Sequence, residues 1–272
     1  APASTHSRPT LPDNGGKREK NLIPAGVGGQ GILSIAIDID NAALDAGFQI
    51  KQAEVHGMAQ RGGAVQSNLR EGDSDIYSDI IPTGKADMVL SVEPLEVMRY
   101  QHYLRPGGWV VTSTTPYVNI PDYPETEPLL ADLAEFENIV MVDTAHFARA
   151  AGNLRAQNMV AVGAASPLLD FKEDRLLAFV EMLFARKGEK IVAVNQRAFR
   201  YGRAAGLFFR GLVDAGMPRL AALSLVGKLD PETIDEAKAG SWAEAIGGDE
   251  TQLEAVLAEE EAVACDRAAA YA

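Results

Sequence analysis

The 272-residue chain has a single cysteine, Cys265, and four histidines that lie far apart in the sequence. One cysteine excludes an internal disulfide, a four-cysteine zinc site and a self-contained iron–sulfur cluster. The histidines form no H-x-x-x-H pair, the spacing that places two imidazoles on one face of a helix. The sequence therefore predicts no metal site in this chain.

Long apolar runs are also missing, since charged residues or glycines interrupt every hydrophobic stretch before the roughly 18 residues that a membrane-spanning helix needs. Residues 1–20 are rich in proline, serine, threonine and glycine and lack the apolar core of a secretory signal. We expect them to form a flexible lead-in, because they bury too little apolar area to offset the entropy cost of ordering. These absences predict a cytoplasmic protein with no membrane partner.

The net charge of −13 is unevenly distributed. Residues 229–272 contain twelve acidic and two basic residues, which gives −10 and leaves −3 for residues 1–228. Because no basic surface is indicated, we do not expect nucleic-acid binding. The acidic tail has two interpretations, a solvated helical face or a docking surface.

What the sequence does contain is an alternation of strand-like and helix-like apolar patterns up to about residue 206. This alternation predicts an α/β fold with a doubly wound, mostly parallel Rossmann-like sheet over residues 21–206. Residues 207–272 are expected to form an acidic helical extension. Strands are expected at residues 21–26, 48–55, 64–72, 88–92, 109–115 and 138–144.

Three local patterns give further expectations. Residues 76–82 alternate like a hairpin partner for the strand at 64–72. Residues 189–206 read as a short strand or turn followed by a helix. In the tail, Asp230 and Pro231 fit the N-cap and first position of a helix.

The segment "AGVGGQG" places Gly26, Gly28 and Gly31 in a G-x-G-x-x-G pattern between a predicted strand and a predicted helix. Unpaired backbone N–H groups and the positive end of the helix favour an anion at such a turn. The pattern alone leaves open a phosphate, a dinucleotide or the packing of a neighbouring chain. A dinucleotide would call for an acidic residue at the end of the second strand, and Glu54 lies slightly late for that role.

A second dense motif, "EVHGMAQRGGAVQSNLR", follows at residues 54–70. Arg61 could pair bidentately with a phosphate or carboxylate, and His56 could exchange a proton near pH 7. The alternative is a loop that packs against the glycine turn, with its polar groups satisfying backbone atoms.

Together the two motifs resemble the gamma-type domain of the 2-oxoacid:ferredoxin oxidoreductase family, with the indolepyruvate members nearest in pattern. The segments "KADMVLSVEPLEVMR", "LRPGGWVVTST" and "VDTAHFARAAGNLRAQNMVAVGA" occur in the family's order. The resemblance covers roughly residues 20–206. The tail beyond it is longer than expected for a stand-alone subunit of this kind.

The resemblance implies an accessory subunit of a larger enzyme. The family decarboxylates a 2-oxoacid on thiamine diphosphate, transfers the acyl group to coenzyme A and passes electrons through iron–sulfur clusters to ferredoxin. The indolepyruvate members act on aryl pyruvates. Thiamine diphosphate, magnesium and the clusters are then expected on a partner alpha subunit, in a hetero-oligomer that reaches ferredoxin indirectly.

The same resemblance implies that coenzyme A contacts this chain. His56 and Arg61 become candidates for catalysis, lining the route towards the partner's active site. An independent NAD- or FAD-dependent oxidoreductase and a non-catalytic assembly protein remain as alternatives. The candidates for coenzyme A binding are Gly26, Gly28, Gly29, Gln30, Gly31 and Gln60.

Overall fold

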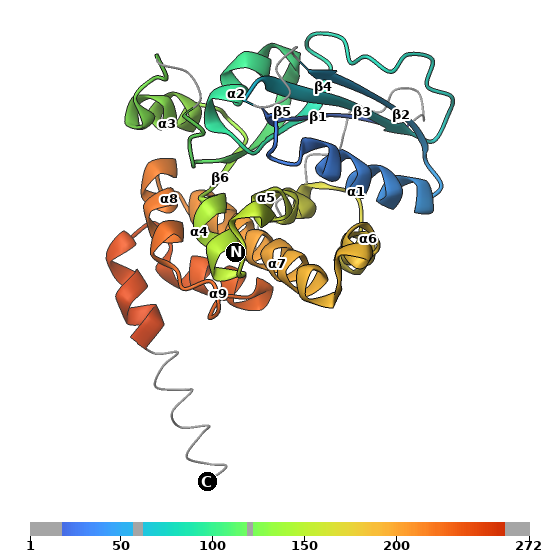
Figure 1. Cartoon of the computed structure of the whole chain (residues 1–272). Helices are drawn as coiled ribbons and strands as arrows, with labels where there is room; N and C mark the ends of the chain where they lie inside the picture. The colour runs from blue at the N-terminus through green and yellow to red at the C-terminus, as the bar shows by residue number, and fades with distance from the viewer. Residues whose placement is uncertain (1–17, 57–61, 119–121, 259–272) are drawn as a thin grey trace, which may run out of the picture.

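The computed structural model describes residues 18–56, 62–118 and 122–258, which form a sheet and a helical layer beside it (Figure 1). The strands are β1 (Glu19–Val27), β2 (Gln49–His56), β3 (Ala64–Gly72), β4 (Ala86–Ser91), β5 (Leu104–Ser113) and β6 (Ile139–Val142). The helices are α1 (Ile32–Asp45), α2 (Pro94–Tyr100), α3 (Thr126–Ala134), α4 (Thr144–Ala150), α5 (Gln157–Ala165), α6 (Glu173–Phe184), α7 (Glu189–Asp214), α8 (Arg219–Lys228) and α9 (Glu236–Ile246).

The six strands form one sheet in the order β2-β3-β1-β4-β5-β6. Strands β1, β4, β5 and β6 pair in parallel, whereas β3 is antiparallel to both β1 and β2. Five strands therefore share one direction and β3 alone opposes them. The predicted α/β class and mostly parallel sheet are confirmed, and each of the six predicted strands is present.

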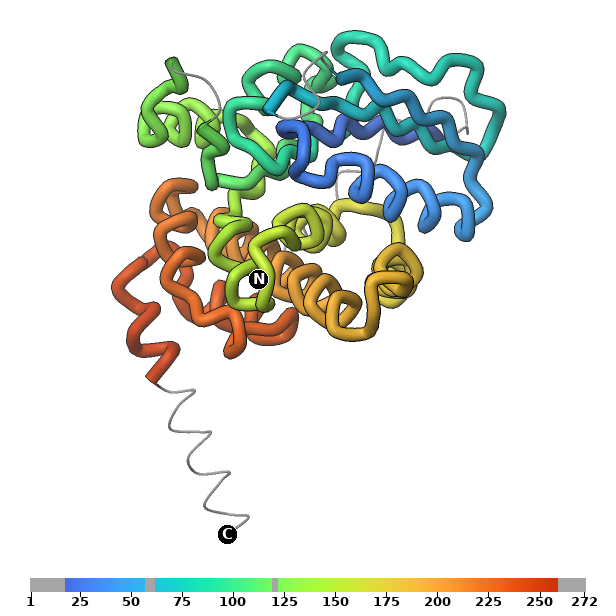
Figure 2. The backbone as a smooth tube through the Cα atoms, viewed as in Figure 1, coloured from blue at the N-terminus to red at the C-terminus, as the bar shows by residue number. Residues whose placement is uncertain are grey.

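Helices cover both faces of the sheet. Helix α1 packs against β1, β2 and β3 and continues into contact with α5 and α6, while α2 packs against β1, β4 and β5. Figures 1 and 2 show α2 on one side of the sheet and α1 with the layer of α4 to α9 on the other. Strand β1 is the centre of the core, because every residue from Lys20 to Val27 is buried.

The helical layer depends on a close approach of α5 and α7. A Cβ on Gly163 would collide with the carbonyl oxygen of Phe199, so the two helix backbones touch at this point. Phe199 and Phe208 on α7 are fully buried. Only a residue without a side chain allows this separation, and the close contact fixes α7 beneath the sheet.

The hairpin predicted for residues 76–82 is wrong. These residues form no strand, because β3 already has β1 on one edge and β2 on the other. The strand or turn predicted near residue 190 is also wrong, since α7 is one continuous helix from Glu189 to Asp214. Both errors arise because local patterns do not reveal which edges or faces a neighbour occupies.

The helix predicted to begin at Asp230 begins five residues later. Asp235 is the N-cap of α9, and its carboxylate accepts a hydrogen bond from the amide of Lys238 at 2.9 Å. Asp230 instead caps a turn, accepting from the amide of Glu232 at 3.0 Å. The predicted boundary at residue 206 falls inside α7, and the division into 21–206 and 207–272 stays a prediction.

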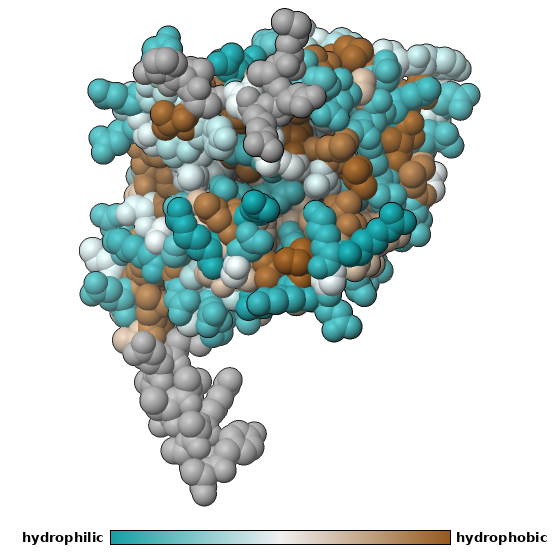
Figure 3. Space-filling model, in the orientation of Figure 1, coloured by the Kyte–Doolittle hydropathy of each residue, from teal (hydrophilic) through white to brown (hydrophobic). Residues whose placement is uncertain are grey.

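Within the described part of the chain, no helix has both the length and the apolar character needed to cross a bilayer. Figure 3 shows that hydrophobic residues on the face in view form several patches separated by hydrophilic side chains. This face therefore presents a mixed surface rather than one continuous apolar area.

Candidate functional site

A cleft of about 450 Å³ lies at the carboxyl ends of the parallel strands, beside the glycine loop. The chain leaves β1 and β4 towards opposite faces of the sheet, because α1, which follows β1, covers one face and α2, which follows β4, covers the other. Open α/β sheets bind ligands at such a switch point. The residues that line the cleft are Gly28, Gly29, Gln30, Tyr117, Asn153, Leu154, Arg155 and Gln157.

The glycine loop presents backbone N–H groups at the start of α1. Gly29 and Gly31 have φ values of 103° and 81°, which glycine adopts without strain. Helix α1 has no side-chain cap, and among the described residues the amides of Gly29, Gly31 and Ile32 donate no hydrogen bond. The loop therefore offers an anion several donors together with the positive end of a helix.

The same loop packs against the end of the second motif. The amide of Gly28 donates to the carbonyl of Gly63 at 2.8 Å, and the amide of Gly62 donates to the carbonyl of Gly28 at 3.4 Å. The amide of Gly28 is therefore already hydrogen-bonded to the neighbouring loop. The packing interpretation of the second motif holds at these glycines.

Gly26 and Gln30 give the loop its shape. A Cβ on Gly26 would come within 2.6 Å of Ile32 Cδ1, and the residue does not line the cleft. The side chain of Gln30 accepts from the amide of Val27 at 2.8 Å and donates to the carbonyl of Val92 at 3.4 Å. Gln30 therefore ties the end of β1 to the end of β4.

The connection between α4 and α5 supplies another wall of the cleft. Asn153 accepts from the amide of Arg155 at 3.0 Å, which starts a short 3₁₀ turn leading into α5. Asn158 on α5 donates to the carbonyl of Gly31 at 3.4 Å, so this wall is joined to the start of α1. Arg155 is exposed, and no acidic residue in the described segments pairs with it.

Arg155 is a candidate binding residue of the cleft that the sequence analysis did not single out. The segment "GNLRAQN" contributed to the family resemblance, but no residue of it was assigned a role. Its position directly after the helix that follows β6 was the available signal, because loops at the carboxyl ends of strands carry ligand-binding residues. Gln157 lies in the same segment, and its side-chain oxygen accepts from the hydroxyl of Thr144 at 3.2 Å.

Two groups with raised pKa values, Glu96 and Tyr123, contact Glu93, the residue that accepts a hydrogen bond from the amide of Tyr117. Burial raises the pKa of Glu96 to about 7, with Arg99 opposing the shift and Glu93 adding to it. Burial and a hydrogen bond to Glu93 raise the pKa of Tyr123 far above its ordinary value. Tyr123 therefore stays a neutral hydrogen-bond donor across the physiological range.

The other predicted site residues lie apart from this cleft or outside the described residues. His56 ends β2, has an exposed side chain and does not line the cleft. Gln60 and Arg61 lie outside the described residues. No catalytic or cofactor role predicted for these residues is tested by the geometry, so the roles stay predictions.

The strand order also bears on the dinucleotide alternative. Glu54 is exposed on β2, and β3 separates β2 from β1. Two interstrand spacings, about 10 Å, therefore lie between the glycine-loop strand and the strand that carries the acid. Glu54 is poorly placed to hold the ribose of a dinucleotide bound at the glycine loop.

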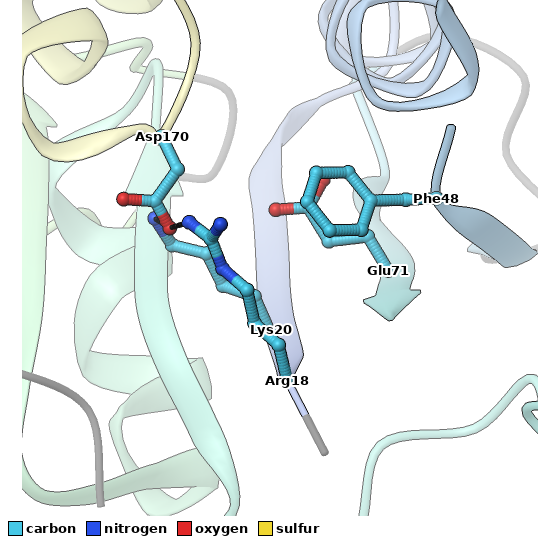
Figure 4. Close-up of a pocket in the computed structure, with 5 residues that line it drawn as sticks. All are labelled: Arg18, Lys20, Phe48, Glu71 and Asp170. Carbon is cyan, nitrogen blue, oxygen red and sulfur yellow. Dashed lines mark hydrogen bonds and ion pairs between the residues drawn. The ribbon is translucent and has the colours of Figure 1, made fainter. Parts of the chain in front are cut away.

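A second cluster lies at the amino end of β1 and is a structural tie (Figure 4). Arg18 and Lys20 both pair with the carboxylate of Asp170, and Lys20 also donates to the carbonyl of Leu168 at 2.8 Å. Although burial opposes it, Lys20 and Arg18 hold the pKa of Asp170 below its ordinary value. The space that these residues enclose with Phe48 and Glu71 does not admit a water molecule.

The fold and the cleft define a doubly wound α/β domain with a candidate anion-binding site at its carboxyl edge. Residues 21–205 match the family model described as pyruvate ferredoxin/flavodoxin oxidoreductase. The chain belongs to this family.

Two relatives are similar over nearly their whole length. A Thermococcus kodakarensis protein named indolepyruvate oxidoreductase subunit IorB is 37% identical over 205 residues, covering 72% of this chain and 100% of the relative. The Pyrococcus horikoshii protein of the same name is 36% identical over 195 residues, covering 68% of this chain and 95% of the relative.

Two solved structures share the fold. The 2-oxoglutarate:ferredoxin oxidoreductase from Magnetococcus marinus, with 2-oxoglutarate, coenzyme A and succinyl-CoA bound, aligns with a TM-score of 0.55 at 19% identity. That alignment covers 85% of this chain and 42% of the Magnetococcus chain. The pyruvate oxidoreductase subunit PORC from Thermotoga maritima aligns with a TM-score of 0.53 at 19% identity, covering 68% of this chain and 96% of the subunit.

Proposed function

We propose that this chain is the accessory subunit of a thiamine-dependent 2-oxoacid oxidoreductase that acts on indolepyruvate or other aryl pyruvates. The enzyme would convert the 2-oxoacid to its acyl-CoA and pass the electrons to ferredoxin. Support comes from relatives named as indolepyruvate oxidoreductase subunits, whose whole length this chain covers or nearly covers. The cytoplasmic location expected from the sequence belongs to this proposal.

The role of this chain in the proposed reaction is to bind coenzyme A. The observation that carries this role is one cleft lined by both the glycine loop and Arg155. Among the described residues the amide of Gly29 in the cleft lining makes no hydrogen bond and suits a phosphate oxygen, and a guanidinium can pair with phosphate bidentately. Tyr117 and Leu154, which are 43% and 44% exposed, offer apolar surface to the rest of the ligand.

Decarboxylation and electron transfer need groups that we assign to a partner alpha subunit. Thiamine diphosphate, magnesium and the iron–sulfur clusters would be held there, since the one cysteine of this chain cannot ligate a cluster. This subunit would then act only in the hetero-oligomer, with His56 and Arg61 as candidates for lining the route between the two sites.

The test is a reconstitution of this chain with its alpha partner. We expect the complex to reduce viologen with indolepyruvate and coenzyme A, while this chain alone binds coenzyme A by calorimetry without turnover. Turnover by this chain alone would contradict the proposed division of labour. Failure of both the chain and the complex to bind coenzyme A would remove the assigned role.

Arg155→Ala gives the sharper measurement. Removing a charged hydrogen bond to phosphate should raise the KM for coenzyme A by roughly tenfold or more, while kcat changes little. Arg186→Ala is the matched control, because Arg186 is also exposed but lies in the 3₁₀ turn that follows α6 and does not line the cleft. An unchanged KM in the Arg155 variant would show that the cleft does not hold the phosphates.

A further inference from the structure

Glu93 is a buried carboxylate that does not line the cleft, and three hydrogen-bond donors use it as their acceptor. It is 1% exposed and lies two residues after β4. One of its oxygens accepts from the amide of Tyr117 at 3.2 Å and from the hydroxyl of Tyr123. Its other oxygen accepts from the amide of Glu96 at 3.0 Å and so caps α2.

The backbone around Glu93 is fixed to the glycine loop. The amide of Val92 donates to the carbonyl of Ala25 at 3.0 Å, and the carbonyl of Val92 accepts from Gln30 at 3.4 Å. The hydroxyl of Ser91 donates to the carbonyl of Glu93 at 2.6 Å. The backbone next to Glu93 is therefore fixed on the glycine-loop side of the cleft, whereas its carboxylate binds the segment of Tyr117 on the other side.

These contacts connect two walls of the same cleft. Gln30 belongs to the glycine loop and Tyr117 to the segment after β5, and both line the cleft. The backbone next to Glu93 is bonded to the first wall through Val92, and the carboxylate of Glu93 accepts from the second wall at the amide of Tyr117. The separation of the two walls thus depends on one side chain that the ligand does not touch.

We propose that Glu93 is a positioning residue, which sets Tyr117 at the distance from the glycine loop that coenzyme A requires. This inference rests on the proposed function, because it assumes that the cleft binds coenzyme A. Loss of the carboxylate removes the acceptor of the Tyr117 amide and of the Tyr123 hydroxyl, so it should release Tyr117 from its place. Ligand binding then has to order the segment of Tyr117, and the entropy cost of that ordering weakens affinity.

A purely structural role for Glu93 makes different predictions. If it served only as the cap of α2, its loss would lower the unfolding temperature and leave coenzyme A affinity unchanged. Asp235→Ala is the matched control, since Asp235 caps α9 with a bond of similar length and does not line the cleft. Both variants should lose stability, but only the Glu93 variant should lose affinity.

The experiment uses the reconstituted complex and three variants, Glu93→Ala, Glu93→Gln and Tyr123→Phe. We expect Glu93→Ala to raise the KM for coenzyme A about tenfold at nearly constant kcat, which corresponds to the loss of one well-placed anchor. Glu93→Gln should recover part of this loss, because its amide oxygen can still accept from Tyr117. Tyr123→Phe removes one of the three donors and should cost about twofold to threefold.

A second readout does not depend on the ligand. Hydrogen exchange at the Tyr117 amide should be at least roughly tenfold faster in Glu93→Ala than in the wild type, since that amide loses its acceptor. Unchanged exchange would overturn the inference whether or not coenzyme A binds. If the wild type binds coenzyme A and Glu93→Ala binds it equally well, the positioning role fails while the proposed function stands. Absence of wild-type binding would instead contradict the proposed function.

Discussion

At the residue scale, the most unusual group is Asp38 on α1. Its side chain is fully buried, and neither carboxylate oxygen has a hydrogen-bond partner among the described residues. Burial raises its pKa from 3.8 to about 8. Burial also raises the pKa values of Asp40 and Glu71 to about 7. In the folded protein, burial therefore favours the protonated form of all three carboxyl groups.

The raised pKa of Asp38 predicts that the protein loses stability as the pH rises. Between pH 4 and pH 8 the unfolded chain releases this proton while the folded chain retains it, so the free energy of unfolding falls by up to about 1.4 kcal/mol per pH unit. Asp38→Asn removes that proton equilibrium. Urea unfolding at pH 5 and pH 7 gives the slope of the free energy of unfolding against pH. Over these two pH units the fall in that free energy should be smaller in the variant than in the wild type, by up to about 3 kcal/mol.

Asp45→Asn is the control for this measurement, because Asp45 ends the same helix but is exposed. It pairs with Arg175 at 3.2 Å, so this variant measures the cost of removing an exposed carboxylate from α1. Equal slopes for the wild type and Asp38→Asn would show that Asp38 is ionised in the folded protein.

At the scale of elements, the sequence predicts what a short segment does alone. The glycine turn, the apolar face of α1 and the strand at residues 64–72 all follow from local periodicity and turn chemistry. The position of β3 between β1 and β2 does not, because strand order depends on long-range pairing. For the same reason the sequence indicated the glycine loop but not Arg155, which reaches the cleft only through the packing of α5 against α1.

The contact between α5 and α7 gives a prediction for glycine. Gly163→Ala should lower the free energy of unfolding by about 1–3 kcal/mol or more, because the added methyl group collides with backbone that cannot move aside cheaply. Gly240→Ala on α9 is the matched control, since nothing lies within 4 Å of its added Cβ. That change should raise stability by roughly 0.5–1 kcal/mol, through the better helix propensity of alanine. Denaturant unfolding of both variants measures the difference, and a Gly163→Ala protein as stable as the wild type would contradict this packing.

At the scale of the whole molecule, the helical layer continues past the end of the family match at residue 205. Helix α9 packs against α7, and Arg203 on α7 donates from Nε and Nη2 to the two carboxylate oxygens of Glu236 on α9, each at 2.8 Å. Composition predicted an acidic helical extension over residues 207–272, and α8 and α9 lie in the described part of that range. It could not indicate this docking, because the buried face of α9 depends on contacts with α7, whose Arg203 lies 33 residues before Glu236.

This docking predicts the outcome of truncation. A chain ending at residue 206 loses Phe208, Phe209 and Leu212, which are fully buried on α7. Burial of each such side chain contributes about 1.5–3 kcal/mol, so the loss is comparable with the 5–15 kcal/mol that typically stabilises a whole domain. We expect this truncated chain to show no cooperative thermal transition by circular dichroism. A chain ending at residue 216 keeps α7 whole and should melt cooperatively at a lower temperature than the full chain. If the shorter chain instead melts like the full one, residues 207–272 are a separable extension, as the composition alone suggested.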